Sequence, residues 1–321
     1  MTRTEILAQT TWTKTRRMQA LFALGLTRLE VAAAMGVGYG FVQNVYTDWV
    51  AAGGRPATLA PAATVTLATF AARPFTRRFG IELEAFGVTR TALVAELQAQ
   101  GLDATVENYN HTTRPHWKAV TDGSLTGADT FELVSPILEG RDGLDAVASA
   151  GRALRHLGAR LNRTCGFHAH FDAAALTIPH LRRICLNYLR LEPLIDSLVA
   201  PSRRGDTNTY CRSIRRPGAE AALAAATTFE GLQQAINGGC RYHKLNLQSF
   251  TRHGTIEFRQ HHGTADAEKV TFWLRFLHCL IDFSEAHEVP ANFAATTAHL
   301  AAFCPREVVT YLTRRQRELA A

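Results

Sequence analysis

Several short segments of the chain alternate between apolar and polar residues, which is the two-residue period of a β-strand. In residues 79–85, Phe79, Ile81 and Leu83 point to one side, and Glu82 and Glu84 point to the other. The same alternation recurs in residues 131–136, 167–172, 242–248 and 255–261. Two further strands are expected at residues 106–110 and 116–121. The sequence therefore predicts a sheet with one apolar face and one face rich in charged groups.

Helical patterns fill the intervals between these predicted strands. Thr89 is a suitable N-cap for a helix that extends to Gln100, and Gly101 would end it. Further helices are expected at residues 144–157, 178–200, 229–236 and 269–286. A helical tail is expected from residue 292 to the end. This mixture of strands and helices indicates an α+β fold.

The first fifty residues predict a small all-α unit. Thr27, with Glu30 three residues later, forms a capping-box pattern at the start of a helix over residues 27–35. A glycine-containing turn separates it from a second helix at residues 39–50, and the pair resembles a helix-turn-helix. The second helix would present Tyr39, Gln43 and Asn44 to a partner. Residues 14–50 are therefore expected either to bind DNA or to form a helical docking module without a nucleic-acid role.

Composition divides the chain into four parts. Residues 1–50 form the helical unit, and residues 51–74, rich in Ala, Gly, Pro and Thr, predict a linker. Residues 75–289 contain the predicted sheet and form the expected catalytic domain. Residues 290–321 form the expected C-terminal tail.

Charge and cysteine usage limit the partners and the compartment. The 321-residue chain has a formal net charge of +7 and a pI near 9.3, which favours an anionic partner. Its six cysteines lack paired short spacing, so neither a zinc ribbon nor a disulfide framework is expected. No apolar run is long enough to span a bilayer, and the start lacks a secretion-signal pattern. We expect a cytoplasmic protein without membrane association; the sequence leaves a homo-oligomer open.

The polar face of the predicted sheet carries the candidate chemistry. Glu82 and Glu84 are like charges about 6.5 to 7 Å apart along one strand, so they repel each other unless a cation lies between them. An exposed strand surface is the alternative interpretation of this pair alone. The other predicted strands and the turn at residues 122–125 add further polar groups to the set, namely Asp122, Glu132, His168, His170, Lys244, Asn246, Glu257 and Arg259. This mixture of acids, histidines and cations favours a reaction cavity.

The ligand types point to a particular metal and substrate. Carboxylates outnumber histidines and no cysteine accompanies them, which favours Mg²⁺ or Mn²⁺ over structural zinc. Such ions bridge phosphate oxygens in phosphoryl transfer, and Arg259 is placed to bind the transferred group. Lys244 supplements it, and so do arginines of the loop at residues 201–217, which is alternatively a solvated basic surface. His243 lies on the apolar face and is expected in the core.

Five ordered motifs carry a family resemblance. They are Phe79-Gly80-Ile81-Glu82-Leu83-Glu84, Asp122-Gly123-Ser124-Leu125, Phe131-Glu132-Leu133-Val134-Ser135-Pro136, Cys165-Gly166-Phe167-His168-Ala169-His170 and Thr255-Ile256-Glu257-Phe258-Arg259. Their order and spacing, over about residues 76 to 285, resemble the amidoligase family, a branch of carboxylate-amine ligases with the glutamine synthetase and glutamate-cysteine ligase fold. The resemblance implies a curved antiparallel sheet of glutamine synthetase-like type with helices packed behind it.

The resemblance also implies roles for individual residues. It implies ATP with Mg²⁺ or Mn²⁺, activation of a carboxylate as an acyl phosphate, and attack by an amine. The implied metal ligands are Glu82, Glu84, Glu132, Glu257 and one or both of His168 and His170, and Asp122 is either a further ligand or a carboxylate of the amine site. The implied catalytic residues are Arg259, Asp122 and Glu257, and the expected ATP contacts are Lys244, Asn246, Arg203 and Arg212. The helical unit at residues 14–50 lies outside the resemblance.

Two other functions remain open at this point. His168, His170 and a glutamate could hold zinc in a metal-dependent hydrolase. Alternatively, the chain is a DNA-binding regulator whose large domain senses a ligand. For a ligase, the sequence does not name the small-molecule or peptide carboxylate and amine that are joined.

Overall fold

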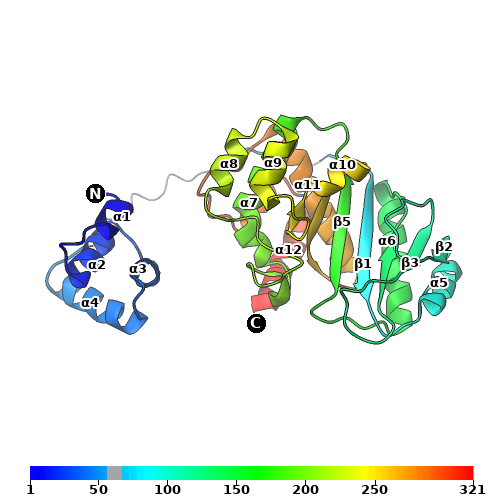
Figure 1. Ribbon diagram of the computed structural model, residues 1–321, viewed down its shortest axis with the longest axis horizontal. Helices are drawn as coiled ribbons and strands as arrows, with labels where there is room; N and C mark the ends of the chain where they lie inside the picture. Colours follow the sequence, from blue (N-terminus) through cyan, green and yellow to red (C-terminus); the bar gives the residue numbers. More distant parts are fainter. Residues whose placement is uncertain (56–66, 72, 321) are drawn as a thin grey trace. The chain divides into compact units, whose positions relative to one another are not determined.

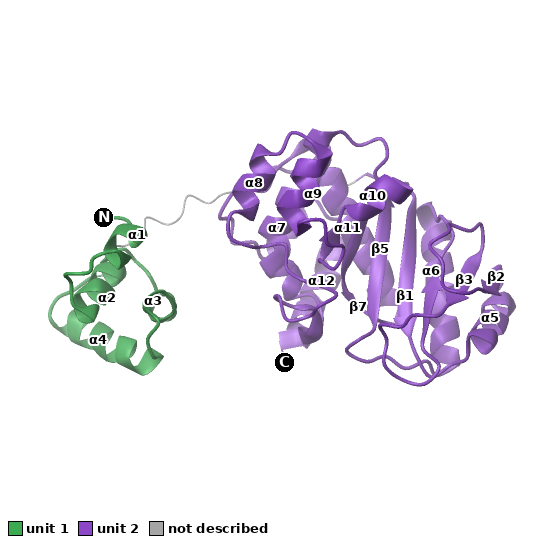
Figure 2. Ribbon diagram, in the orientation of Figure 1, with its two compact units in different colours: residues 1–65 green, residues 66–321 purple. Residues whose placement is uncertain are grey.

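A computed structural model describes residues 1–55, 67–71 and 73–320. The chain divides into two compact units, residues 1–65 and residues 66–321, which are coloured separately in Figure 2. Half of the predicted linker of residues 51–74, namely residues 56–66 and 72, lies outside the described residues. Of its described part, residues 67–71 belong to the second unit: Leu67 is buried there, and the amide of Phe70 donates to the carbonyl oxygen of Ala302 at 2.7 Å.

The N-terminal unit is all-helical over residues 1–55. Its helices are α1 (Arg3–Leu7), α2 (Lys14–Ala23), α3 (Arg28–Met35) and α4 (Tyr39–Ala51). The predicted capping box is confirmed, because Thr27 and Glu30 exchange side-chain and backbone hydrogen bonds at the start of α3. The unit has a small core of its own, made of Ile6, Met18, Leu21, Phe22, Val31, Val42 and Val45.

The second unit contains a mostly antiparallel sheet (Figure 1). Within the described residues it has seven strands, in the order β2-β3-β4-β1-β5-β7-β6. Their bounds are β1 Phe79–Ala85, β2 Ala104–Val106, β3 Trp117–Val120, β4 Phe131–Val134, β5 Gly166–Asp172, β6 Leu245–Asn246 and β7 Thr255–His262. The β2–β3 pair is parallel, and the other pairs are antiparallel.

Two strand predictions were wrong in their extent. The strand expected at residues 106–110 lies earlier, at β2, because the chain after Val106 forms a loop. The strand expected at residues 242–248 is reduced to the two residues of β6, and Gln248 begins helix α10.

Helices make up most of the rest of the second unit. They are α5 (Arg90–Ala99), α6 (Gly140–His156), α7 (Ile178–Asp196), α8 (Ala219–Ala225), α9 (Phe229–Asn237), α10 (Gln248–His253), α11 (Ala267–Ala286) and α12 (Arg306–Ala320), with 3-10 turns η1 (Pro201–Arg203) and η2 (Thr297–Ala302). The segment expected as a tail packs into the same core as the sheet through Leu300, Phe303 and Val308. No helix in the described ranges is long and apolar enough to cross a membrane.

Helices α6, α7 and α11 cover the apolar face of the sheet. A Cβ on Gly143 of α6 would lie 3.0 Å from the ring of Phe79, and the ring of Tyr188 on α7 lies 5.6 Å from that of Phe258. The predicted α+β architecture, with helices packed behind a largely antiparallel sheet, is therefore confirmed. The opposite face of the sheet is left for polar groups.

An irregularity interrupts the alternation of β7. The pairing of β5 with β7 shifts register between Phe167 and Ala169, as a β-bulge does. Beyond the shift, His261 lies on the apolar side, 5.9 Å from the ring of Phe167 and 5.0 Å from that of Trp273. Regular alternation over residues 255–261 predicts His261 on the polar face with Glu257, and this prediction is wrong because alternation does not carry through a bulge.

Candidate functional site

A cavity of about 590 Å³ opens on the polar face of the sheet. Most residues singled out from the sequence line it, and they come from β1, β4, β5, β6, β7 and two loops: Glu82, Glu84, Asp122, Glu132, His168, His170, Arg203, Asn246, Glu257 and Arg259. The alternation in β1 explains part of this, because Ile81 and Leu83 are buried in the core while the two glutamates face the cavity.

Strand register places the acidic groups opposite one another. Glu82 on β1 pairs with His168 on β5, and Nδ1 of His168 lies 2.9 Å from Oε2 of Glu82. Glu84 pairs across the other edge of β1 with Glu132 on β4. The carboxylate of Glu84 also accepts a hydrogen bond from the backbone amide of Gly166 on β5. The carboxylates are thus fixed by the backbone of neighbouring strands.

Among the described residues, three groups of side chains could hold a metal ion. In each group the ligand atoms lie within 4.8 Å of one another. The groups are Glu82, His170 and Glu257; Glu82, Glu132 and His168; and Glu84, Asp122 and Glu132. Because Glu82 and Glu132 each belong to two groups, the three candidate positions form one continuous cluster.

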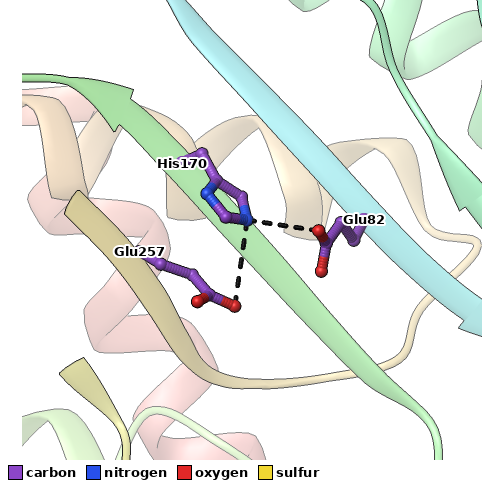
Figure 3. Close-up of side chains that lie close together, drawn as sticks. All are labelled: Glu82, His170 and Glu257. Carbon is purple, nitrogen blue, oxygen red and sulfur yellow. Dashed lines mark ion pairs between the residues drawn. The ribbon is translucent and has the colours of Figure 1, made fainter. Parts of the chain in front are cut away.

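The first of these groups shows an unsatisfied donor or acceptor. Figure 3 shows His170, Glu82 and Glu257, from three adjacent strands, pointing toward one another. Nε2 of His170 lies 3.4 Å from Glu82 and 3.8 Å from Glu257, yet it is buried and makes no hydrogen bond to any described residue. A buried nitrogen without a partner, beside two carboxylates, fits a position that a cation would complete.

Burial and crowding separate the acidities of the carboxyl groups. Burial raises the pKa of Glu132 well above its usual value, and the charges of Glu82, Glu84 and Asp122 act in the same direction. Burial would also raise the pKa of Glu82, but the imidazole groups of His170 and His168 outweigh it and hold that pKa well below the usual value. The histidines and the raised pKa of Glu132 therefore offset only part of the negative charge of the cluster.

Arg259 lies at the β7 end of this cluster. Its guanidinium forms an ion pair with Glu257, whose other oxygen accepts a hydrogen bond from Asn246 at 2.6 Å. Burial would raise the pKa of Glu257, but Arg259 and His170 keep it below its usual value. Nε of Arg259 is buried and has no hydrogen-bond partner within the described part of the chain. Arg259 therefore lines the cavity with one donor that no described residue satisfies.

The loop at residues 201–217 is divided between the cavity and the surface. Arg203 is almost fully buried, lines the cavity and donates to the carbonyl oxygen of Thr164 at 3.2 Å. Its Nε is another buried donor that no described residue accepts from. Arg212, in contrast, is exposed and does not line the cavity, so its placement does not support the expected contact with ATP.

Lys244 also lies outside the cavity. Its side chain is fully buried on the α7 side, where Nζ lies 2.8 Å from Glu192 and 2.6 Å from Asp196. The expected ATP contact assumed a regular strand at residues 242–248. Because only Leu245 and Asn246 are in strand geometry, the alternation that placed Lys244 beside Asn246 does not hold. The predicted core position of His243 agrees with its burial.

Several cavity residues were not singled out from the sequence. They include Tyr109, His111, Gln233, Arg241, Tyr242, Arg252 and His253. Most lie in loops or short turns, where no two-residue or 3.6-residue period marks which side chains share a face. A second cavity, of about 230 Å³, adjoins the first and shares Glu82, Glu132 and His170 with it.

A deep polar cavity that combines clustered carboxylates, imidazoles and buried guanidinium groups is typical of an enzyme active site. The chain belongs to the amidoligase family: residues 75–281, more than half of its length, match the family described as "Putative amidoligase enzyme". This membership supports a ligase-type activity, and it confirms the resemblance seen in the five motifs.

Other comparisons are more distant. A solved structure titled "Crystal structure of novel glutamine synthase homolog" aligns with 77% of this chain and 67% of its own, at 15% identity and a TM-score of 0.35. No curated protein matches the sequence.

Proposed function

We propose that this protein is an ATP-dependent ligase that joins a carboxylate to an amine through an acyl-phosphate intermediate. The observation that supports it most is the continuous cluster of candidate metal ligands beside two buried guanidinium groups, in a chain of the amidoligase family. A carboxylate is a poor electrophile at neutral pH, and phosphorylation gives it a good leaving group. The cavity has the charges that such a reaction requires.

The acidic cluster is the proposed binding site for Mg²⁺ or Mn²⁺. The ligands would be Glu82, Glu132, His168, His170 and Glu257. Glu84 completes the third group of ligands, together with Asp122. Carboxylate oxygens are the ligands that these ions prefer, and bound ions would neutralise negative charge on phosphate oxygens.

Arg259 and Arg203 are the proposed phosphate-binding residues. Both residues line the cavity, and each has a buried Nε that donates to no described residue. A guanidinium group binds phosphoryl oxygens through paired donors and keeps its charge at any accessible pH. Arg259 stabilises the charge of the transferred phosphoryl group, and Glu257 with Asn246 holds its guanidinium in place.

The incoming amine has to lose a proton before or during its attack. Asp122 and Glu132 line the cavity and are the proposed proton acceptors. The side chain of Asp122 has a fixed orientation, because one of its carboxylate oxygens accepts a hydrogen bond from the backbone amide of Ser124 at 2.7 Å. Asp122→Asn and Glu132→Gln separate the two candidates: loss of amide formation with continued carboxylate activation identifies the base.

The test uses the full chain with ATP, Mg²⁺ and a panel of amino acids and short peptides. Hydroxylamine in place of the amine traps an acyl phosphate as a hydroxamate, which is measured together with ADP release. Arg259→Ala and Glu257→Gln are expected to lower hydroxamate formation on the order of 100-fold or more. Arg141→Ala, at a 91% exposed side chain on α6, is the control and should retain full activity.

Two outcomes would contradict different parts of the proposal. Carboxylate-dependent hydroxamate formation that survives both substitutions would reject the roles given to Arg259 and Glu257, although the ligase activity itself would stand. Tight stoichiometric zinc, with no nucleotide binding across the panel, would instead support the metal-dependent hydrolase.

A further inference from the structure

The described residues that line the candidate ligase cavity all belong to the second unit, and the N-terminal unit is a separate helical unit. Its core is separate from that of the sheet, and residues 1–55 form helices α1 to α4. Helices α3 and α4 are joined by the three residues Gly36, Val37 and Gly38. Gly36 caps α3 with φ of 61°, a left-handed conformation that glycine adopts without strain. A short helix, a three-residue turn and a longer helix follow one another in the order of a helix-turn-helix.

The exposed residues of α4 include small and polar ones, which form its polar face, together with Tyr39, Phe41 and the acidic Asp48. Val42 and Val45 point into the small core, whereas Gly40, Asn44 and Thr47 are exposed. A Cβ on Gly40 would meet nothing within 4 Å, so another molecule can approach the helix backbone closely there. Side-chain amides such as that of Asn44 match the donor and acceptor pattern of adenine in the major groove.

Arg28 links the two helices at this face. It is the first residue of α3, and its guanidinium donates to Oε1 of Gln43 on α4 at 2.7 Å. The same guanidinium lies 5.3 Å from the ring centroid of Tyr46. These contacts hold a positive charge beside the polar face, where a phosphate group of a bound duplex would lie.

The charge balance of the unit agrees with a polyanionic partner. Residues 1–55 contain six basic side chains (Arg3, Lys14, Arg16, Arg17, Arg28 and Arg55) and three acidic ones (Glu5, Glu30 and Asp48). The carboxylates of Glu5 and Glu30 both take part in capping boxes, where they accept hydrogen bonds from backbone amides. Two of the three acidic side chains of the unit are therefore hydrogen-bonded at the N-termini of its own helices.

We infer that this unit binds duplex DNA, with the N-terminal half of α4 in the major groove and Arg28 at the backbone. Leu29, Tyr39 and Phe41 are exposed beside the face, at 70%, 45% and 47%. In this arrangement they contact sugars and thymine methyl groups. A protein partner is the competing occupant of these apolar residues, but the net charge and the exposed amide favour DNA.

The experiment measures binding of the full chain to a labelled duplex of mixed sequence by fluorescence anisotropy, over a range of salt concentrations. Binding is expected in the micromolar range at low salt and should weaken steeply as salt rises. Asn44→Asp adds a negative charge at an exposed position, so it should weaken binding roughly tenfold without unfolding the unit. Arg28→Ala should also weaken binding and reduce the salt slope by about 1.

Controls separate this site from the ligase site. Arg141→Ala and Glu257→Gln, both in the second unit, should leave duplex binding unchanged. Circular dichroism confirms that each variant is folded. Enrichment of one sequence from a randomised duplex pool, lost in Asn44→Ala, would support groove recognition.

Any of four results would overturn the inference. Three are the absence of salt-sensitive duplex binding, equal affinity for single-stranded and duplex DNA, and binding that is unaffected by both Arg28→Ala and Asn44→Asp. A change of oligomeric state in Phe41→Ser, with no effect on DNA, would assign the face to protein contact and would also overturn it.

Discussion

Glu84 and Glu132 lie directly opposite each other on the antiparallel strands β1 and β4. Like charges at opposed positions destabilise a strand pair, and here burial raises the pKa of Glu132 further. A fold that keeps such a pair in its central strands carries a cost that a bound cation removes. The pair is therefore more informative about function than either glutamate alone.

The first prediction concerns stability without and with metal. A glutamate whose pKa is raised on folding is destabilising at pH above its unfolded value, so Glu132→Gln should stabilise the metal-free protein by about 1 kcal/mol at pH 7. The same substitution should reduce the rise in melting temperature that Mg²⁺ produces in the wild type. Thermal unfolding in EDTA and in Mg²⁺ measures both. Glu230→Gln, at an exposed position, should change neither; a variant of Glu132 that is less stable and still responds to Mg²⁺ would assign the pair a structural role.

The second prediction concerns the ion pairs of Lys244. Substitution by Met leaves the carboxylate of Glu192, which is 2% exposed, without its cation, so Lys244→Met should lower the free energy of unfolding by about 3–5 kcal/mol. Glu192 also accepts hydrogen bonds from Ser213 and from the amide of Ile214, so the arginine-rich loop should loosen as well. Urea unfolding measures the loss, with Lys269→Met as the control. If stability is unchanged while ATP affinity falls, Lys244 contacts the nucleotide after all.

Much of the site could be predicted wherever a strand is regular. In β1 and β5 the alternation runs over seven residues each, so it correctly placed Glu82, Glu84, His168 and His170 on the face opposite the apolar core. The pattern failed at Lys244, because two residues of strand geometry are too few to set a face.

Loops and bulges limited the prediction in a different way. The bulge in the β5–β7 pairing reversed the expected side of His261. Tyr109, His111 and Arg241 reach the cavity from segments outside helices and strands, so no local period marks them. Nothing in these side chains alone names the acid or the amine that is joined.

The third prediction tests how closely the buried arginine and histidine approach the backbone. A Cβ on Gly166 would lie 3.0 Å from Nη2 of Arg203 and 3.0 Å from Nε2 of His168, so both groups would have to shift in Gly166→Ala. Displacements of this size in an active site reduce rates by up to about 100-fold, so ligase activity should fall by roughly tenfold to 100-fold. Gly123→Ala is the matched control, because its Cβ would meet nothing within 4 Å. Equal activity of the two variants would show that Arg203 and His168 need no fixed position.

The fourth prediction concerns the stability of the protein in acid. Burial lowers the pKa of His262 to about 4, and the nearby charges of Arg315, Lys269 and Arg203 act in the same direction. Its imidazole is therefore neutral in the folded protein, while in the unfolded chain it binds a proton below about pH 6.5. The stabilising contribution is present above pH 6.5 and is lost as the pH falls toward 4, which amounts to about 2 kcal/mol between pH 7 and pH 5.

Urea unfolding at a series of pH values measures this loss. His262→Gln should flatten the decline between pH 7 and pH 5, because the variant has no imidazole that gains a proton only on unfolding. His156→Gln, at a 69% exposed side chain, serves as the control and should keep the wild-type slope. Some decline should persist in His262→Gln, since burial also places the pKa of the adjacent His261 well below its usual value. Identical slopes in the wild type and His262→Gln would mean that His262 is protonated in the folded state or is open to water.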